Sequence, residues 1–281
     1  MLSILFGLGA ALGWGAGDFT GGLAARKTGA YRAVFYGEVA GIFVLFTAIA
    51  IVGESTPSLN VWLLSMLAGA FGTIGLMLLY QSMTLGMMSI AAPVSALLAA
   101  MLPVFVGAFT EGLPQLLTLI GFGFALFAVW MVSQGKGGVT DILAHLSDLK
   151  LPLLAGIGFG LYFVVMHQAT SAGATIWPMV ASRSGGMILI AIYMLITRAS
   201  WKVEDNSAWW LIIINGILDI SGNLFFILAG QAGRLDVAAV LSSLFPGATV
   251  VLAWIFLKER LTRNQWVGIV SALIAIVLMT L

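Results

Sequence analysis

Cysteine is absent from this 281-residue chain, and charged residues are scarce. Without thiols the chain cannot form disulfides or thiolate metal sites. Charged residues make up 8% of the sequence, whereas soluble domains carry about 25%, so they are too few to cover a surface that faces water. The net charge of +1 and the lack of a basic run leave no electrostatic basis for binding nucleic acid.

Hydrophobic residues are abundant instead: they make up 61% of the chain, and the mean hydropathy is +1.10. Apolar runs of about 17–25 residues match the length of a helix that crosses the hydrocarbon core, and the alternating polarity of barrel strands is missing. We therefore predict an all-α membrane protein with ten transmembrane helices. The predicted spans are residues 2–23, 31–52, 61–83, 87–109, 115–133, 151–170, 174–197, 207–229, 234–256 and 263–281.

The two halves of the chain repeat each other at a constant offset of 147 residues. At this offset Trp62 corresponds to Trp209, Ser95 corresponds to Ser242, and several glycines and an Ala-Ala pair also match. A unit of five spans is odd, so its second copy must enter the membrane from the opposite side. We predict two inverted five-helix repeats, residues 1–135 and 151–281, joined by a polar linker at 136–150. Many secondary transporters have this architecture, with the site between the halves.

Basic residues are concentrated in the loops that follow odd-numbered spans, and Arg234 is the only one that follows an even-numbered span. The positive-inside rule then places both termini outside the cell. We expect a multi-pass protein of the inner (plasma) membrane. The basic residues after odd-numbered spans are Arg26, Lys27, Arg32, Lys136, Lys150, Arg198, Lys202, Lys258, Arg260 and Arg263.

The last two spans carry a recognisable pattern, GRLDVAAVLSSLFPGATVVLAWIFLKERLTRNQWVGIVSALIAIVLM. It resembles the end of the EamA family of the drug/metabolite transporter superfamily. A weaker copy, AAPVSALLAAMLPVFVGAFTEGLP, closes the first half, and the opening GWGAGDFTGGLAARKTG also looks like the family. The resemblance implies a ten-helix carrier of small metabolites such as amino acids or related amines. It also implies that both termini are cytoplasmic, which is the reverse of what the loop charges predict.

Asn215, Asp219 and Asn223 recur every four residues and therefore share one face of a helix. Asp219 lies near the middle of its predicted span, where a charged aspartate costs roughly 2.5–3.5 kcal/mol on insertion scales. A cavity that holds substrate or a proton would explain this face. The alternative is a stripe of interhelical hydrogen bonds that holds the bundle together.

Two further acids, Asp18 and Glu38, lie within predicted spans at a similar depth, and Trp14 is one turn before Asp18. Both acids are candidates for substrate binding. Alternatively, they pair with basic residues at the membrane edge, namely Arg26, Lys27 or Arg32.

Arg183 is the only arginine deep in a predicted span, and its counterpart in the first repeat is Tyr36. Its planar fork suits a substrate carboxylate, or it is a fixed partner of Glu38 or Asp219. Three deep acids against one arginine favour a cationic or zwitterionic amine, or proton coupling, over an anionic substrate.

His167, Tyr80 and Gln81 complete the candidate residues. A histidine titrates near neutral pH, so Asp219, Glu38 and His167 are the candidates for proton coupling, although packing is the commoner role of such a histidine. Tyr80 and Gln81 belong to a candidate wall for binding a cation, which also contains Tyr162, Trp177 and Tyr193.

These observations predict a secondary active transporter of small metabolites, with an amino acid or another amine or zwitterion as substrate and alternating access as mechanism. The alternatives are a proton-coupled exporter of cationic drugs or quaternary amines and, further off, a channel or membrane scaffold. Metal-hydrolase and nucleophile motifs are missing, so we expect no enzyme, no cofactor and no metal. The expected partners are a small-molecule substrate, membrane lipid and protons, and we expect a monomer.

Overall fold

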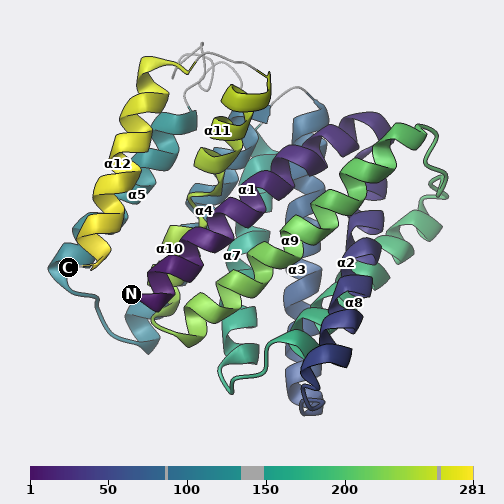
Figure 1. Cartoon of the computed structure of the whole chain (residues 1–281), viewed down its shortest axis with the longest axis horizontal. Helices are drawn as coiled ribbons and strands as arrows, with labels where there is room; N and C mark the ends of the chain where they lie inside the picture. The colour runs from purple at the N-terminus through teal and green to yellow at the C-terminus, as the bar shows by residue number, and fades with distance from the viewer. Residues whose placement is uncertain (86–87, 134–148, 258–260, 281) are drawn as a thin grey trace.

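The computed structural model describes residues 1–85, 88–133, 149–257 and 261–280, and all regular structure in these ranges is helical (Figure 1). The helices are α1 (Leu2–Thr28), α2 (Ala30–Val52), α3 (Leu59–Thr84), α4 (Met88–Thr110), α5 (Leu116–Ser133), α7 (Lys150–Thr170), α8 (Ile176–Ile196), the short 3-10 helix η2 (Asn206–Ala208), α9 (Trp209–Gln231), α10 (Leu235–Ser242), α11 (Phe245–Leu257) and α12 (Arg263–Thr280).

Seven of these helical stretches are long and apolar enough to cross a membrane, and they coincide with the predicted spans one, two, three and six to nine. Three shorter apolar helices, Val94–Thr110, Leu116–Val132 and Arg263–Met279, lie at the predicted spans four, five and ten. The all-helical, multi-pass class is therefore confirmed. That all ten cross the bilayer remains a prediction.

The predicted ninth span is two helices instead of one. α10 ends at Ser242 and α11 begins at Phe245, so the helix is interrupted at Ser243 and Leu244. Pro246 follows in the first turn of α11, where the missing backbone N–H of proline is tolerated. This interruption brings Phe245 to the wall of the central cavity.

The two halves of the chain pack through equivalent pairs of helices, in which the first half and the second half swap places. α1 packs along α9, and α3 packs along α7, which are the same two positions in the five-helix repeat with the halves interchanged (Figure 1). Likewise α2 contacts α9 and α8 contacts α3, while α5 packs on its own counterpart α12. This reciprocity is what an approximate two-fold relation between two repeats produces.

Glycines allow the helices of different halves to approach closely. A Cβ atom at Gly13 of α1 would lie 2.7 Å from the backbone nitrogen of Gly222 on α9. Gly222 in turn faces the ring of Trp14, and its counterpart Gly75 faces the ring of Phe159. A glycine packed against an aromatic ring therefore occurs both where α1 crosses α9 and where α3 crosses α7.

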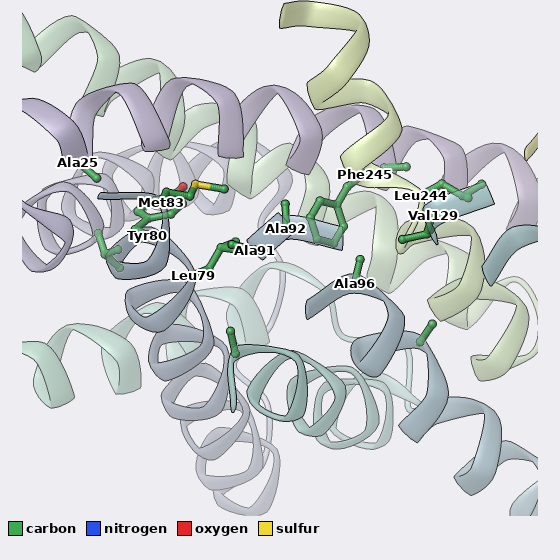
Figure 2. Packing of buried hydrophobic residues seen from close by; sticks show 14 of the residues in the cluster. Ala25, Leu79, Tyr80, Met83, Ala91, Ala92, Ala96, Val129, Leu244 and Phe245 are labelled. Carbon is green, nitrogen blue, oxygen red and sulfur yellow. The ribbon is translucent and has the colours of Figure 1, made fainter. Parts of the chain in front are cut away.

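Small side chains dominate the buried interior, with a few large ones between them. Figure 2 shows Ala92 of α4 beside Phe245 and Ala91 beside Leu79. Large apolar side chains instead cover the outside, such as Phe43, which is 69% exposed. An apolar outer surface of this kind suits contact with lipid. A capping box begins the last helix, because Thr262 N donates to Gln265 Oε1 (2.8 Å) and Gln265 N donates to Thr262 Oγ1 (3.3 Å).

Candidate functional site

A cavity with a polar lining lies between the two halves of the chain. Its cavity volume is about 70 Å³, and it is lined from α1, α2, α3, α7, α8, α9 and α11. Its polar lining residues are Asp18, Glu38, Thr73, Ser182, Arg183, Asp219 and Asn223.

Arg183 binds two acids at the centre of this cavity. Its Nη1 lies 3.2 Å from Glu38 Oε2, and its Nη2 contacts Asp219 Oδ2. Glu38 belongs to the first half of the chain and Asp219 to the second, so one buried guanidinium links both repeats. We call Glu38, Arg183 and Asp219 the central ion trio.

Neighbouring polar groups hold the carboxylates of the trio in place. Thr73 Oγ1 on α3 donates to Glu38 Oε1 (2.9 Å). Asn223 Nδ2, one turn after Asp219, donates to the backbone oxygen of Asp219 (2.6 Å) and to its Oδ2 (3.1 Å). Tyr162 on α7 donates its hydroxyl to Asn223 Oδ1. The amide of Asn223 therefore connects a tyrosine of one helix to an acid of another.

Asp18 of α1 lines the same cavity but is not paired. Its side chain is buried, with 7% of the residue exposed, and it makes no hydrogen bond or ion pair with any residue that the structure describes. The sequence suggested Arg26, Lys27 or Arg32 as its partner at the membrane edge. Lys27 instead contacts Asp205 (3.5 Å), and Arg32 donates to the backbone oxygen of Ser200 (2.8 Å).

Asp205 lies in the loop before α9 and shows how these edge charges are satisfied. Its Oδ1 accepts from Ser207 N (2.8 Å). The hydrogen bonds from Ser207 and the neighbouring ammonium of Lys27 hold the pKa of the Asp205 carboxyl below its usual value. The basic end of α1 is therefore tied to the loop before α9 and not to the cavity.

Asn215 and Tyr80 do not reach the cavity, although the sequence suggested both as substrate ligands. Asn215 Nδ2 donates to the backbone oxygen of Gly17 (2.8 Å) and to Tyr80 Oη (3.1 Å). These bonds tie α9 to α1 and α3 in a fully packed layer, since Asn215 and Tyr80 are both buried. Of the predicted polar stripe, Asp219 and Asn223 line the cavity, whereas Asn215 links helices.

Tyr36, Gln81 and His167 also lie away from the cavity. Tyr36 donates its hydroxyl to the backbone oxygen of Trp201 (2.8 Å), and the side of α3 that carries Gln81 is exposed. His167 Nε2 is 3.9 Å from Glu111 Oε1 near the end of α7. Their predicted roles in substrate or proton binding have no geometric support in the described residues.

One wall of the cavity is aromatic. Trp14 stacks on Phe163 with the ring centroids 5.4 Å apart, and Phe159 and Tyr162 line the same space. Trp14 and Tyr162 were expected from the sequence, whereas Phe159 and Phe163 were missed because an apolar aromatic in an apolar span carries no signal. Thr73 and Ser182 were missed as well, although each is a polar residue in the interior of an apolar helix.

A second charged cluster lies where α10 begins. Arg234 Nη2 is 2.8 Å from Oδ2 of the fully buried Asp236, and its Nε is 3.9 Å from Glu111 Oε2. Arg234 also donates to the backbone oxygen of Gly112 (2.6 Å). Within the described ranges, no three acidic or histidine side chains gather in a way that could hold a metal ion.

Known proteins resemble the chain along its whole length. The model of the EamA-like transporter family matches residues 1–134 and again residues 148–281. A protein of Lactiplantibacillus plantarum described as a sugar uptake protein is 24% identical over 285 residues, which cover 98% of this chain and 96% of that protein.

Other matches are shorter or structural. An uncharacterized protein of Methanocaldococcus jannaschii is 32% identical over 94 residues, covering 34% of this chain and 69% of that protein. An uncharacterized solute carrier family 35 member of Schizosaccharomyces pombe is 37% identical over 70 residues, covering 25% of this chain and 14% of that protein. A solved crystal structure shares the fold, with a TM-score of 0.79 at 17% identity, over 99% of this chain and 96% of that one.

Proposed function

The chain belongs to the EamA-like transporter family, and from this premise we propose that it is a secondary active transporter of a small amine or zwitterion, such as an amino acid. The family membership and the names of its relatives support a membrane transporter. The substrate class is our inference from the cavity.

The observation that carries this proposal is the charge balance of the cavity. Its described lining holds three carboxylates, Asp18, Glu38 and Asp219, against one guanidinium, Arg183. Two of the carboxylates already share the arginine. A substrate that brings one positive charge improves this balance, whereas an added anion worsens it.

The other contacts of an amine or zwitterion are also available in this cavity. An ammonium group interacts favourably with the face of an aromatic ring, and Trp14 and Tyr162 belong to the wall. A substrate carboxylate would meet Arg183, whose guanidinium has five donors in a planar fork. Binding of that carboxylate would compete with Glu38, which holds Arg183 only through a contact of 3.2 Å.

The transport mechanism that we propose is rocking of one inverted repeat against the other around the central ion trio. The exchanged packing of α1 on α9 and α3 on α7 supplies the interface between the moving parts. On one side of the cavity, Asn215 ties α9 to α1 and α3. At the opposite end, Trp177 donates to the backbone oxygen of Glu54 (2.8 Å). We propose that the contacts of Asn215 close one side of the cavity and that the Trp177–Glu54 contact closes the other. In this proposal the two sets of contacts break alternately, and the carrier is a monomer in the plasma membrane.

A neutral sugar is the second candidate substrate. The relative described as a sugar uptake protein aligns over 98% of this chain. Aromatic rings beside hydrogen-bonding groups, as in Trp14 next to Asn223 and Ser182, would also suit a polyhydroxylated ring. The charge balance does not favour a sugar, because none of its groups would offset the acids.

Thermal unfolding of the purified protein with a panel of compounds tests the substrate class. The panel contains lysine, its decarboxylated form cadaverine, tetramethylammonium and glucose, because a ligand that binds the native state raises the apparent stability. We expect lysine or cadaverine to raise the Tm of the wild type and of Ser221→Ala. Ser221 bonds only to the carbonyl of Ile217 on its own helix, which makes it a matched control on α9.

The same compounds should leave the Tm of Asp219→Asn unchanged. A shift with glucose alone would replace the proposal by the second candidate. A shift with tetramethylammonium alone would favour an exporter of cationic drugs.

A further inference from the structure

Asp18 is the one acid of the cavity lining that has no counter-charge of its own. It is 7% exposed, and within the described part of the chain no donor contacts its carboxyl group. Arg183, the guanidinium of the described cavity lining, is bound on Nη1 by Glu38 and on Nη2 by Asp219. An unpaired carboxyl group at more than nine-tenths burial therefore lines the cavity between the two halves.

Two further acids, Glu38 and Asp219, line the same cavity as Asp18 and disfavour a negative charge on it. α1 and α9 touch at this level, since a Cβ atom at Gly17 would lie only 3.6 Å from the backbone nitrogen of Asp219. Among the described side chains of α11, Phe245 is the one that lines the cavity. The titratable and charged groups that face Asp18 from the helices packed around it are Asp219 on α9, Glu38 on α2, Arg183 on α8, Tyr80 on α3 and Tyr162 on α7.

Burial of an unpaired charge costs several kcal/mol, and a buried acid avoids this cost by taking up a proton. Glu38 and Asp219 both contact the guanidinium of Arg183, which gives each of them a counter-charge. Asp18 has no such partner. Among the three acids of the described lining, Asp18 therefore gains most from binding a proton.

We propose that the carboxyl group of Asp18 is the proton-binding site of this carrier and that it exchanges its proton for the ammonium group of the substrate. In the empty cavity Asp18 is a neutral carboxylic acid. When an amine enters, the acid releases its proton to water and the resulting carboxylate pairs with the ammonium group. The proton site stands on the geometry alone, whereas the exchange step rests on the proposed function.

This assignment differs from what the sequence suggested. Asp219, Glu38 and His167 were the predicted proton carriers, but the first two share Arg183, and His167 lies beside Glu111 away from the cavity. Asp18 was predicted only as a substrate ligand. The sequence does not show that Asp18 lacks a partner, because this depends on Arg183 of α8 contacting Glu38 and Asp219 instead.

Labelling with dicyclohexylcarbodiimide tests the proton site without knowledge of the substrate. This apolar reagent reacts with protonated carboxyl groups in surroundings of low polarity, and mass spectrometry locates the adduct. We expect label on Asp18 in the wild-type protein, with a yield that falls as the pH is raised. Glu111, which is partly exposed and lies outside the cavity, serves as the control carboxyl group.

Labelling of Asp219 or Glu38 with Asp18 unlabelled would overturn the proposal, and so would a yield at Asp18 equal to that at Glu111. Asp18→Asn keeps the shape of the neutral acid, so its Tm should equal that of the wild type at acidic pH. A large loss of Tm would show that Asp18 is a structural anion, which also overturns the proposal.

Protection by cadaverine tests the exchange step separately. We expect cadaverine to suppress labelling of Asp18 and to release protons from unbuffered protein, and we expect no proton release from Asp18→Asn. If Asp18 is labelled but cadaverine neither protects it nor releases protons, the proton site holds and the proposed exchange for an amine fails.

Discussion

Arg183 and Glu38 join the two halves of the chain at the centre of the helix bundle, with Arg183 Nη1 3.2 Å from Glu38 Oε2. Arg183 lies on α8 and Glu38 on α2, two helices that occupy the same position in their respective repeats. Because Arg183 also holds Asp219, one side chain fixes the spacing of three helices around the cavity. A carrier that rocks its repeats must change these distances during transport.

Arg183→Gln should destabilise the protein strongly, because it leaves the buried Glu38 and the partly buried Asp219 without their shared counter-charge. Loss of one partner of a buried ion pair costs about 3–5 kcal/mol, which thermal unfolding in detergent would detect. Arg183→Lys should be less harmful to stability, since the charge remains, but one ammonium group cannot replace the fork.

Ser184→Ala is the matched control, because the Ser184 hydroxyl bonds only to the carbonyl of Val180 on α8. Wild-type stability of Arg183→Gln would mean that the trio does not hold the halves together.

The cluster at the start of α10 gives a second test of buried charge. Arg234→Gln should lower the Tm, because Asp236 is fully buried and loses its partner at 2.8 Å. The double variant Arg234→Gln/Asp236→Asn should recover part of the loss, since it removes the unpaired anion. The single variant Asp236→Asn is measured as well. If the losses of Tm of the two single variants simply add up in the double variant, the two residues act independently and the prediction is wrong.

Gly13→Ala should destabilise the protein by about 1–3 kcal/mol through overpacking, because its Cβ atom would lie 2.7 Å from the backbone nitrogen of Gly222. Gly123→Ala is the control: Gly123 is also helical, but among the described residues no atom outside its own stretch of helix lies within 4 Å of an added Cβ atom. Alanine there should be neutral or stabilise the helix by up to about 1 kcal/mol. Equal Tm values for the two variants would contradict the close crossing of α1 and α9.

The orientation of the chain can be measured directly, because the native sequence has no cysteine. Thr56→Cys lies in the loop between α2 and α3, and Asn206→Cys lies before α9, both at exposed positions. If the loop charges set the topology, a membrane-impermeant maleimide should label Thr56→Cys in intact cells and Asn206→Cys only after lysis. The reverse pattern would place the termini in the cytoplasm, as the family resemblance implies.

Much of the fold was predictable, because the hydrophobic effect of the bilayer and the repeat at a fixed offset both leave direct traces in the sequence. The gathering of Asp18, Glu38, Arg183 and Asp219 was also expected, since isolated charges in apolar helices need partners or a wet cavity.

The roles within the polar stripe were not predictable. Asn215 and Asn223 share a face of α9, yet Asn215 meets the backbone of Gly17, whereas Asn223 faces the cavity. That difference depends on which helix packs opposite each turn. Tyr80 and Gln81 are neighbours in sequence, but only Tyr80 turns into the bundle. Residue type alone could not distinguish them.

Counterflow in proteoliposomes tests the central claim most directly. Vesicles loaded with unlabelled cadaverine or lysine are diluted into labelled compound, and entry of label is followed for the wild type, Ser221→Ala and Asp219→Asn. We predict saturable accumulation above equilibrium in the first two and none in Asp219→Asn. Flux that rises without saturation and without counterflow, or equal counterflow in all three proteins, would contradict a carrier that operates through the central ion trio.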